Sequence, residues 1–283
     1  MSFIDWLLGG RSKRKAPPAV QHLFASQGLY GVLYADGRVR SFRADGTAVH
    51  AETVHGPRVA WDGEALVDSQ ADNFHGQPFF VRGELLQVGK GELRHGARVE
   101  EADWLMPSAQ LRLVRAEDGR VALLDPFMNQ AVVLSPAELR RVGDRALPVM
   151  DGCFDGADLL LVREGRIERY DVAGALVERV QPHGLQTLAV APGASLGLDA
   201  KDQLELRHGD EVHTLGPAAE QVQLFSEGGL VCTTATGFFT DGVVVDVPHQ
   251  GLLVAEDHIL VASDPLALYN RSGRCVRQFD PVR

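Results

Sequence analysis

Residues 37–42, Gly-Arg-Val-Arg-Ser-Phe, and residues 165–170, Gly-Arg-Ile-Glu-Arg-Tyr, repeat one pattern, Gly-Arg-(Val/Ile)-x-x-aromatic, 128 positions apart. In both copies a Gly follows the aromatic by four residues, and a Val follows that Gly by three. The second half of the pattern recurs at Tyr269, Gly273 and Val276. This spacing is typical of a strand that ends in an aromatic, a tight Gly turn and a further strand. Its recurrence predicts a protein built from β repeats.

The rest of the chain is a succession of short apolar runs separated by Gly, Asp and Pro, as at 29–34, 121–124, 159–162 and 259–262. Grouped in fours, these runs give seven units of about 37 residues, close to the roughly 40 of a four-stranded propeller blade. Their expected boundaries are 20–56, 57–100, 101–145, 146–184, 185–216, 217–248 and 249–283. We therefore expect an all-β chain, with a single β-propeller of seven four-stranded blades over residues 20–283. Six or eight blades are the alternatives, since the second, third and sixth units are irregular.

The sequence also predicts a short helix in the third unit and the first strands of the second unit. The run 135–138, Ser-Pro-Ala-Glu, has the cap, first-turn Pro and third-position Glu of a helix start, and predicts a short helix through about Val142. In the second unit we place the first two strands at 59–61 and 65–67. The ring closes either end to end or with a strand lent by the chain after residue 18, and the sequence leaves both open.

Composition limits the function. The chain carries a net charge of −10, with +3 on residues 1–18 and −13 on the remainder, which argues against general nucleic-acid binding. The three cysteines, Cys153, Cys232 and Cys275, lie far apart without metal-ligand spacing, which favours a reducing compartment. Neither a secretion signal nor an apolar run of membrane-spanning length is evident, so a cytoplasmic location is expected.

The N-terminal segment, residues 1–19, is predicted to be a separate attachment point. Phe3, Ile4, Leu7 and Leu8 fall on one face of a short helix, with Trp6 beside them. A cationic run at 11–15 follows. Two helical turns are unstable alone, so the segment gains order by docking, either in a partner groove or on its own propeller. Membrane attachment is the weaker alternative, because one short apolar face and four cations give marginal affinity.

A long polar loop interrupts the second unit at 68–80. Loops of this kind on a rigid scaffold often carry recognition, and Phe74 and His75 are the expected contacts. The alternative is that Phe74 folds back on the blade while Phe79 and Phe80 begin the third strand.

An enlarged turn follows at 125–130, Asp-Pro-Phe-Met-Asn-Gln. An exposed Phe127-Met128 pair at its tip would be a partner contact. The alternative is that both side chains pack under the neighbouring blade.

Three histidines precede the first strand of a unit: His55, His183 and His249. Converging imidazoles would hold a divalent metal. Recurrence at blade junctions is also what a hydrogen-bonded inter-blade turn produces, and the units concerned lie too far apart for one ion. We therefore expect no metal site and no cofactor.

The pattern Gly-Arg-(Val/Ile)-x-x-aromatic with its later Gly and Val resembles propeller repeats of the NHL, PQQ-like and bacterial WD40-like kinds, although the Trp-Asp ending of WD40 blades is missing. The chain also looks like the stand-alone propellers that accompany MoxR-type ATPases and von Willebrand A proteins in bacteria. That resemblance implies an adaptor whose partner is an ATPase or its adaptor.

Linear catalytic signatures, such as a Gly-x-Ser-x-Gly elbow, a P-loop or an HExxH motif, do not occur. We therefore expect a non-enzymatic protein-interaction scaffold or adaptor. The alternative is a propeller enzyme or small-ligand binder, such as a metal-dependent hydrolase or lyase, acting at the channel mouth.

Overall fold

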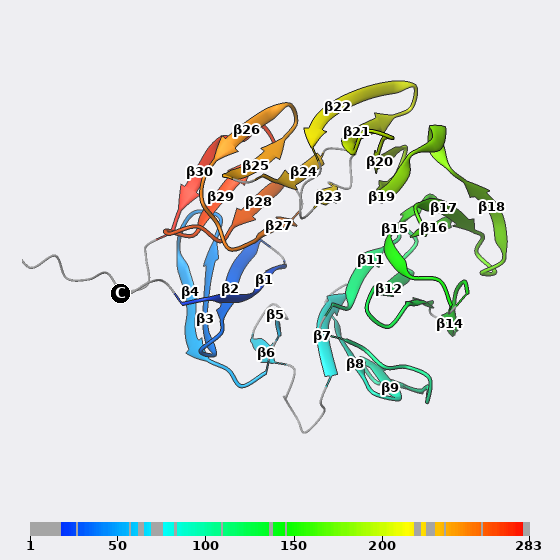
Figure 1. Ribbon diagram of the computed structural model, residues 1–283. Helices are drawn as coiled ribbons and strands as arrows, with labels where there is room; N and C mark the ends of the chain where they lie inside the picture. The colour runs from blue at the N-terminus through cyan, green and yellow to red at the C-terminus, as the bar shows by residue number, and fades with distance from the viewer. Residues whose placement is uncertain are drawn as a thin grey trace, which may run out of the picture.

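Seven four-stranded antiparallel sheets stand side by side around a ring in the computed structural model (Figure 1). The structure describes residues 18–26, 28–56, 58–61, 65–68, 76–81, 84–108, 110–135, 138–144, 146–217, 222–224, 230–234, 236–255 and 257–279. Each sheet is one blade and its four strands follow one another in the chain, so the expected all-β propeller of seven blades is confirmed. The predicted helix at 3–8 lies outside the described residues.

The bounds of the strands follow the predicted units closely. Blade 1 holds β1 (Val20–Ser26), β2 (Leu29–Tyr34), β3 (Arg38–Arg43) and β4 (Ala48–Thr53); blade 2 holds β7 (Gly76–Val81), β8 (Glu84–Gly89), β9 (Glu92–His95) and β10 (Arg98–Glu101); blade 3 holds β11 (Arg112–Arg115), β12 (Val121–Asp125), β13 (Gln130–Leu134) and β14 (Leu139–Arg141). Blade 4 holds β15 (Val149–Asp155), β16 (Asp158–Arg163), β17 (Arg166–Tyr170) and β18 (Leu176–Val180); blade 5 holds β19 (Gln186–Ala191), β20 (Ala194–Leu198), β21 (Gln203–His208) and β22 (Glu211–Pro217). Blade 6 holds β23 (Val222–Leu224), β24 (Leu230–Thr233), β25 (Gly237–Thr240) and β26 (Val243–Asp246); blade 7 holds β27 (Leu252–Ala255), β28 (His258–Val261), β29 (Ala267–Asn270) and β30 (Cys275–Gln278).

The repeated pattern occupies one place in the blade. Its aromatic residues, Phe42, Tyr170 and Tyr269, lie on the third strand and are 4%, 4% and 7% exposed. In each of these three blades the pairing of the third strand with the fourth shifts register between the aromatic and the residue before it. The later Gly of each copy has a positive φ in the turn between these strands and donates its N–H three residues back. The pattern therefore encodes a buried aromatic, a bulge and a tight turn.

The first strand of each blade lies on the inside of the ring and the fourth on the outside. First strands of neighbouring blades contact one another, as β15 contacts β11 and β19. Among the fourth strands, β18 and β30 are exposed along their length, whereas β14 is half-buried. Apolar cores fill the spaces between blades. Among the described residues, the core between blades 4 and 5 is the smallest, with three buried members, Leu160, Val162 and Val190.

The ring closes end to end. β1 and β27 belong to different sheets, so neither terminal blade borrows a strand from the other among the described residues. The junction is held by an apolar cluster from blades 1 and 7, in which Phe42 stacks on Phe279. The Val20 N–H also donates to Gln250 Oε1 at 2.8 Å.

The prediction for the second unit was wrong in its strand order. β5 (Val59–Trp61) and β6 (Leu66–Asp68) form a separate two-stranded sheet, and β5 contacts both β1 and β7, so this small sheet lies in the ring between blades 1 and 2 (Figure 1). Phe79 and Phe80 belong to the first strand of blade 2, β7, rather than to a third strand. Pairing explains the difference: β7 and β8 share six residue pairs, whereas β5 and β6 share three.

The helix predicted from Ser135 to Val142 was also wrong. Leu139–Arg141 forms β14 and pairs with Val132–Leu134 of β13. The Ser135 hydroxyl accepts a hydrogen bond from the Glu138 N–H at 3.1 Å, as in a cap, but the chain then turns back along the sheet. A local cap is therefore outweighed by a sheet edge that needs a fourth strand. The helical structure among the described residues is one 3-10 turn, η2 (Pro182–Gly184), and no described helix has the length and apolar character to cross a membrane.

Candidate functional site

Asp125 fixes the backbone of the enlarged turn between β12 and β13 through hydrogen bonds. This carboxylate is fully buried and accepts hydrogen bonds from the N–H groups of Phe127 (3.1 Å) and Met128 (3.0 Å). It also accepts from the backbone N–H and hydroxyl of Ser108, at 2.6 and 2.7 Å. Asn129 completes the turn with a φ of 51°. A buried carboxylate with four donors fixes the backbone of the turn, so the side chains at its tip are presented in a fixed direction.

Phe127 at this tip is 70% exposed, the highest exposure among the large described hydrophobic residues. The alternative that it packs under the neighbouring blade is therefore wrong for Phe127, whereas Met128 is half-buried.

The linker from blade 2 to blade 3 is tethered to the same turn and carries two further apolar residues, Trp104 and Met106. The carbonyl of Trp104 accepts a hydrogen bond from the Gln130 side chain at 3.2 Å, at the far end of the turn from the Ser108 contact. Met106 lies between these two tethers and is 43% exposed. The ring of Trp104 is partly covered by the Arg141 guanidinium, 4.2 Å from its centroid. We call Trp104, Met106, Phe127 and Met128 the blade-3 patch.

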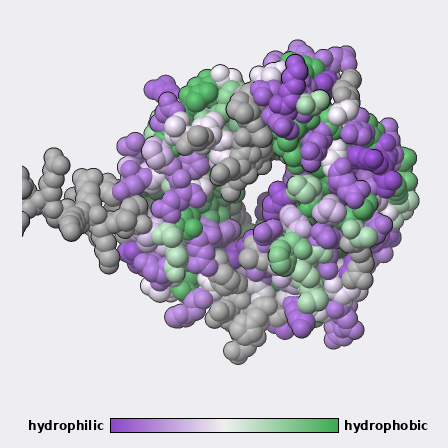
Figure 2. All heavy atoms as spheres, in the orientation of Figure 1, coloured by the Kyte–Doolittle hydropathy of each residue, from purple (hydrophilic) through white to green (hydrophobic). Residues whose placement is uncertain are grey.

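Polar side chains on the inside of the ring serve mainly to join neighbouring first strands. Arg112 of β11 donates to Met150 O of β15 at 2.6 Å, and Asp151 of β15 accepts from Val190 N of β19 at 3.0 Å. Gln223 of β23 bonds both Leu252 O and Val254 N of β27, at 3.0 and 2.8 Å. Figure 2 shows an opening at the centre of the ring. These polar side chains satisfy backbone groups on the inner edges, which would otherwise depend on water.

Two of the three predicted histidines have described contacts. His249 Nε2 is hydrogen-bonded to Gly237 O at 2.9 Å, and His55 is exposed with its backbone N–H donating to Asp68. The side chain of His183 lies outside the described residues. Among the residues that the structure does describe, no group of three or more His, Cys, Asp or Glu has the geometry of a metal site. The bond from His249 joins the junction of blades 6 and 7 to the start of β25, and the expectation for the three histidines stays a prediction.

The other predicted contacts fall on undescribed parts of the chain. Phe3, Ile4, Trp6, Leu7 and Leu8 lie in residues 1–17, and Phe74 and His75 lie in residues 69–75. Their roles stay predictions.

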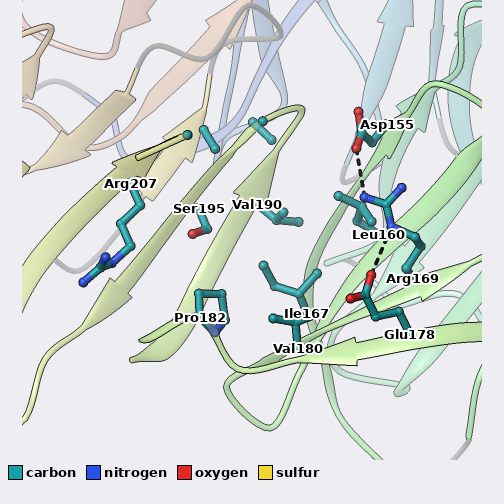
Figure 3. Close-up of a pocket in the computed structure, with 14 residues that line it drawn as sticks. Asp155, Leu160, Ile167, Arg169, Glu178, Val180, Pro182, Val190, Ser195 and Arg207 are labelled. Atoms are coloured by element: carbon teal, nitrogen blue, oxygen red, sulfur yellow. Dashed lines mark hydrogen bonds and ion pairs between the residues drawn. The ribbon is translucent and has the colours of Figure 1, made fainter. Parts of the chain in front are cut away.

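A groove that the sequence did not reveal runs between blades 4 and 5 (Figure 3). Its volume is about 250 Å3. Cross-strand pairing decides which side chains face it: Cys153 pairs with Leu160, Leu160 with Arg169, and Arg169 with Glu178, so all four share one face of blade 4. Blade 5 contributes mostly small residues to the opposite wall, among them Ala191, Gly193, Ala194 and Ser195.

Three carboxylates surround one guanidinium on the blade-4 wall. Arg169 lies 3.2 Å from Asp155, 3.1 Å from Asp158 and 3.8 Å from Glu178. Hydrogen bonding to Asp158, with the nearby charge of Asp155, raises the pKa of Arg169 above its usual value despite partial burial. Leu160, Ile167, Val180 and Val190 supply the apolar lining.

Cys153 lies on the same face of blade 4, in surroundings that disfavour its thiolate form. Burial raises the pKa of Cys153 far above its usual value, and the charges of Asp151 and Asp155 act in the same direction. Reactive cysteines need the opposite environment, with cations or a helix N-terminus nearby. Charged and apolar side chains therefore define the chemistry of the groove lining.

The comparisons with known proteins agree with the fold. No protein-family model and no curated protein matches the sequence. The WD40 domain of Pan2 from Neurospora crassa is similar in structure, with a TM-score of 0.54 and 11% identity over 94% of this chain and 92% of that one. A streptogramin B lyase gives a TM-score of 0.51 and 9% identity over 89% of this chain and 93% of that one.

A third similar structure is PorZ of Porphyromonas gingivalis, an essential surface component of the type-IX secretion system. Its TM-score is 0.53 at 14% identity, covering 95% of this chain and 38% of that one. At these identities the likeness establishes a fold. The chain is thus a seven-bladed β-propeller of four-stranded sheets, with structural neighbours among both WD40 and lyase propellers.

Proposed function

We infer that this propeller is a non-enzymatic protein-interaction scaffold that contacts a protein partner through the blade-3 patch. One observation carries the proposal: a 70% exposed Phe127 stands on a turn whose backbone is fixed by the buried Asp125. An exposed aromatic side chain on a fixed backbone adds contact area when a partner binds, and little conformational entropy is lost. Full burial of a Phe side chain contributes about 1.5–3 kcal/mol.

The surroundings of Phe127 support the same function. Met128 follows it in the turn and Met106 is exposed on the linker tethered to that turn, and methionine adapts its shape to a partner surface. Trp104 on the same linker packs partly on the core and carries the Arg141 guanidinium over its ring, and these residue types are frequent in protein interfaces. Residues 1–19 would provide a second attachment point. The expectation that the partner is an ATPase or its adaptor rests on the sequence resemblance alone and stays a prediction.

An affinity pull-down from the native host with mass spectrometry tests the scaffold. Wild type, Phe127→Ser, Val244→Ser and a chain lacking residues 1–18 are compared. Val244 is the matched control, since it is 61% exposed on the outer strand of blade 6. We expect a stoichiometric partner with wild type and Val244→Ser, and recovery about tenfold lower with Phe127→Ser, equivalent to about 1.4 kcal/mol.

Two results would contradict the proposal: absence of any stoichiometric partner, or equal recovery by Phe127→Ser and Val244→Ser. The first would turn attention to the alternative of an enzyme or small-ligand binder at the channel mouth. Loss of the partner from the truncated chain alone would move the main contact to the N-terminal segment.

A further inference from the structure

We propose that the groove between blades 4 and 5 is a second docking site, which receives a basic side chain from an extended peptide segment of a partner protein. The site is independent of the blade-3 patch, because it lies on other blades and has different chemistry.

The groove forms because small residues of blade 5 lie opposite blade 4 and leave the space between the two blades incompletely filled. Blade 5 offers residues such as Ala191, Gly193 and Ala194 where blade 4 presents Leu160 and Ile167. The buried core at this junction has three members, the fewest of the inter-blade cores among the described residues. The volume of about 250 Å3 is below the roughly 300–1,000 Å3 of small-molecule sites. It suits one or two side chains rather than a cofactor.

The charge of the blade-4 wall favours a cation. Arg169 neutralises one of the three carboxylates around it, which leaves an excess of two negative charges on this wall. The distance from Arg169 to Glu178 is the longest of the three, and the Glu178 side chain is 56% exposed. Glu178 is therefore the carboxylate most available to a ligand. On the other wall, Arg207 is already paired with Glu205 at 3.0 Å. A second cation near Glu178 would balance the site.

Polar groups on the opposite wall can bind a peptide. Ser195 lines the groove (Figure 3). Arg207 lines it as well, and its Nε is buried without a hydrogen-bond partner among the described residues. Buried polar groups in proteins are nearly always paired. A peptide carbonyl would accept a hydrogen bond from Arg207 Nε, and the Ser195 hydroxyl can accept one from a Lys ammonium.

The strand edge beside the groove favours a peptide over a free amine. β18 pairs only with β17 among the described residues, so its outer edge carries unpaired backbone groups. Two of its residues, Glu178 and Val180, line the groove. A peptide added along this edge would place alternate side chains toward the groove, with main-chain hydrogen bonds supplying affinity. The expected ligand therefore alternates a basic residue with an apolar one on one face.

Two fluorescein-labelled peptides test the site on the full chain: Val-Ser-Lys-Ser-Leu-Ser-Lys, and its counterpart with Glu at both Lys positions. Fluorescence polarisation is measured with wild type, Glu178→Gln, Ser195→Leu and Glu211→Gln. Glu211→Gln is the matched control for charge, because Glu211 lies on the outer strand of blade 5 and its side chain is 75% exposed. Circular dichroism of each variant confirms that it remains folded.

We expect the Lys peptide to bind wild type at least tenfold more tightly than the Glu peptide. Glu178→Gln should weaken binding by about threefold, in the range of an exposed ion pair, and added salt should do the same. Ser195→Leu, which fills the groove, should abolish binding in a folded protein, whereas Glu211→Gln should leave it unchanged.

Equal weakening by Glu178→Gln and Glu211→Gln would overturn the proposal, because it would show general attraction to an acidic chain. Equal binding of the two peptides, binding that survives Ser195→Leu, or absence of binding at millimolar peptide would overturn it as well. None of these results bears on the blade-3 patch, whose partner is tested by the Phe127 variant.

Discussion

Phe42 in the third strand of blade 1 stacks on Phe279, just beyond the last strand of blade 7, with ring centroids 4.5 Å apart and an angle of 22° between the planes. Phe42 is the aromatic residue of the pattern that first indicated the repeat. The contact joins positions 237 residues apart in the sequence. End-to-end closure of the ring thus uses the buried aromatic position of the repeated pattern. In blade 1 this residue packs on the last blade of the ring.

Removal of Phe279 is expected to loosen the ring. Phe279 is 2% exposed, so Phe279→Ala should lower the free energy of unfolding by about 3–5 kcal/mol. Val276→Ala is the control, since Val276 is 47% exposed three residues earlier and should change stability by no more than about 0.5 kcal/mol. Urea unfolding measures both. Similar stabilities of the two variants would mean that the Phe42–Phe279 contact does not close the ring.

A buried ion-pair network between blades 3 and 4 predicts a second large effect. Arg163 and Glu168 are 1% and 2% exposed, and Glu168 also accepts hydrogen bonds from Tyr170 (2.5 Å) and Arg179 (2.8 Å). Arg163 in turn donates to backbone carbonyls of the linker that follows β14, including Leu147 O at 2.8 Å. Glu168→Gln keeps the shape but leaves a buried cation, so it should cost about 3–5 kcal/mol in urea unfolding.

Glu178→Gln is the matched control for that substitution. Glu178 is on the neighbouring strand and exposed, so its variant should keep wild-type stability within about 0.5 kcal/mol. If Glu168→Gln were as stable as Glu178→Gln, the network would not contribute to the fold.

Gly143 reports on the same network through sterics. Its φ is +79°, and a Cβ there would lie 2.8 Å from both Arg163 Nη2 and Tyr170 Oη. Gly143→Ala should therefore destabilise more than Gly156→Ala, which has a φ of +60° and no atom within 4 Å of the added Cβ. Backbone strain alone costs about 1 kcal/mol at such positions. Thermal unfolding distinguishes them, and equal melting temperatures would contradict the packing described at Gly143.

His22 predicts a pH dependence of stability. Burial, aided by the positive charge of Arg58, lowers the pKa of His22 from 6.5 to about 3. Between these values the unfolded chain binds a proton that the native chain does not, so His22 lowers stability as the pH falls below 6.5. The slope from this residue is at most about 1.4 kcal/mol per pH unit. When the pH is lowered from 7.5 to 5.0, the free energy of unfolding should therefore fall by about 1–2 kcal/mol less for His22→Asn than for wild type. Urea unfolding at the two pH values measures this difference. An equal fall in both proteins would contradict the buried environment of His22.

The fold was predictable because its signal is local. A buried aromatic, a bulge and a Gly turn need particular residue types at fixed spacing, so Phe42, Tyr170 and Tyr269 marked three blades directly. The errors came where pairing partners decide the outcome. Leu139–Arg141 follows a good helix cap but completes a sheet, and Val59–Trp61 has the composition of a blade strand but finds only one short partner.

The candidate sites were predictable in part. Phe127 and Met128 stood out because an apolar pair at a turn tip is unusual, whereas Trp104 and Met106 reach the patch only through hydrogen bonds from a different segment. The groove was invisible because Asp155, Arg169 and Glu178 come from different strands. Their common face depends on register, including the shift after Arg169, which alternation in the sequence does not specify.

The most direct test of the scaffold is a photo-crosslinking amino acid placed at position 127 of the full chain in the native host, with position 244 as control. Both positions are exposed, at 70% and 61%, so substitution should leave the fold intact. We predict one abundant crosslinked protein from position 127 and none of that species from position 244. Position 127 yielding no adduct, or the same adducts as position 244, would contradict a partner surface on blade 3.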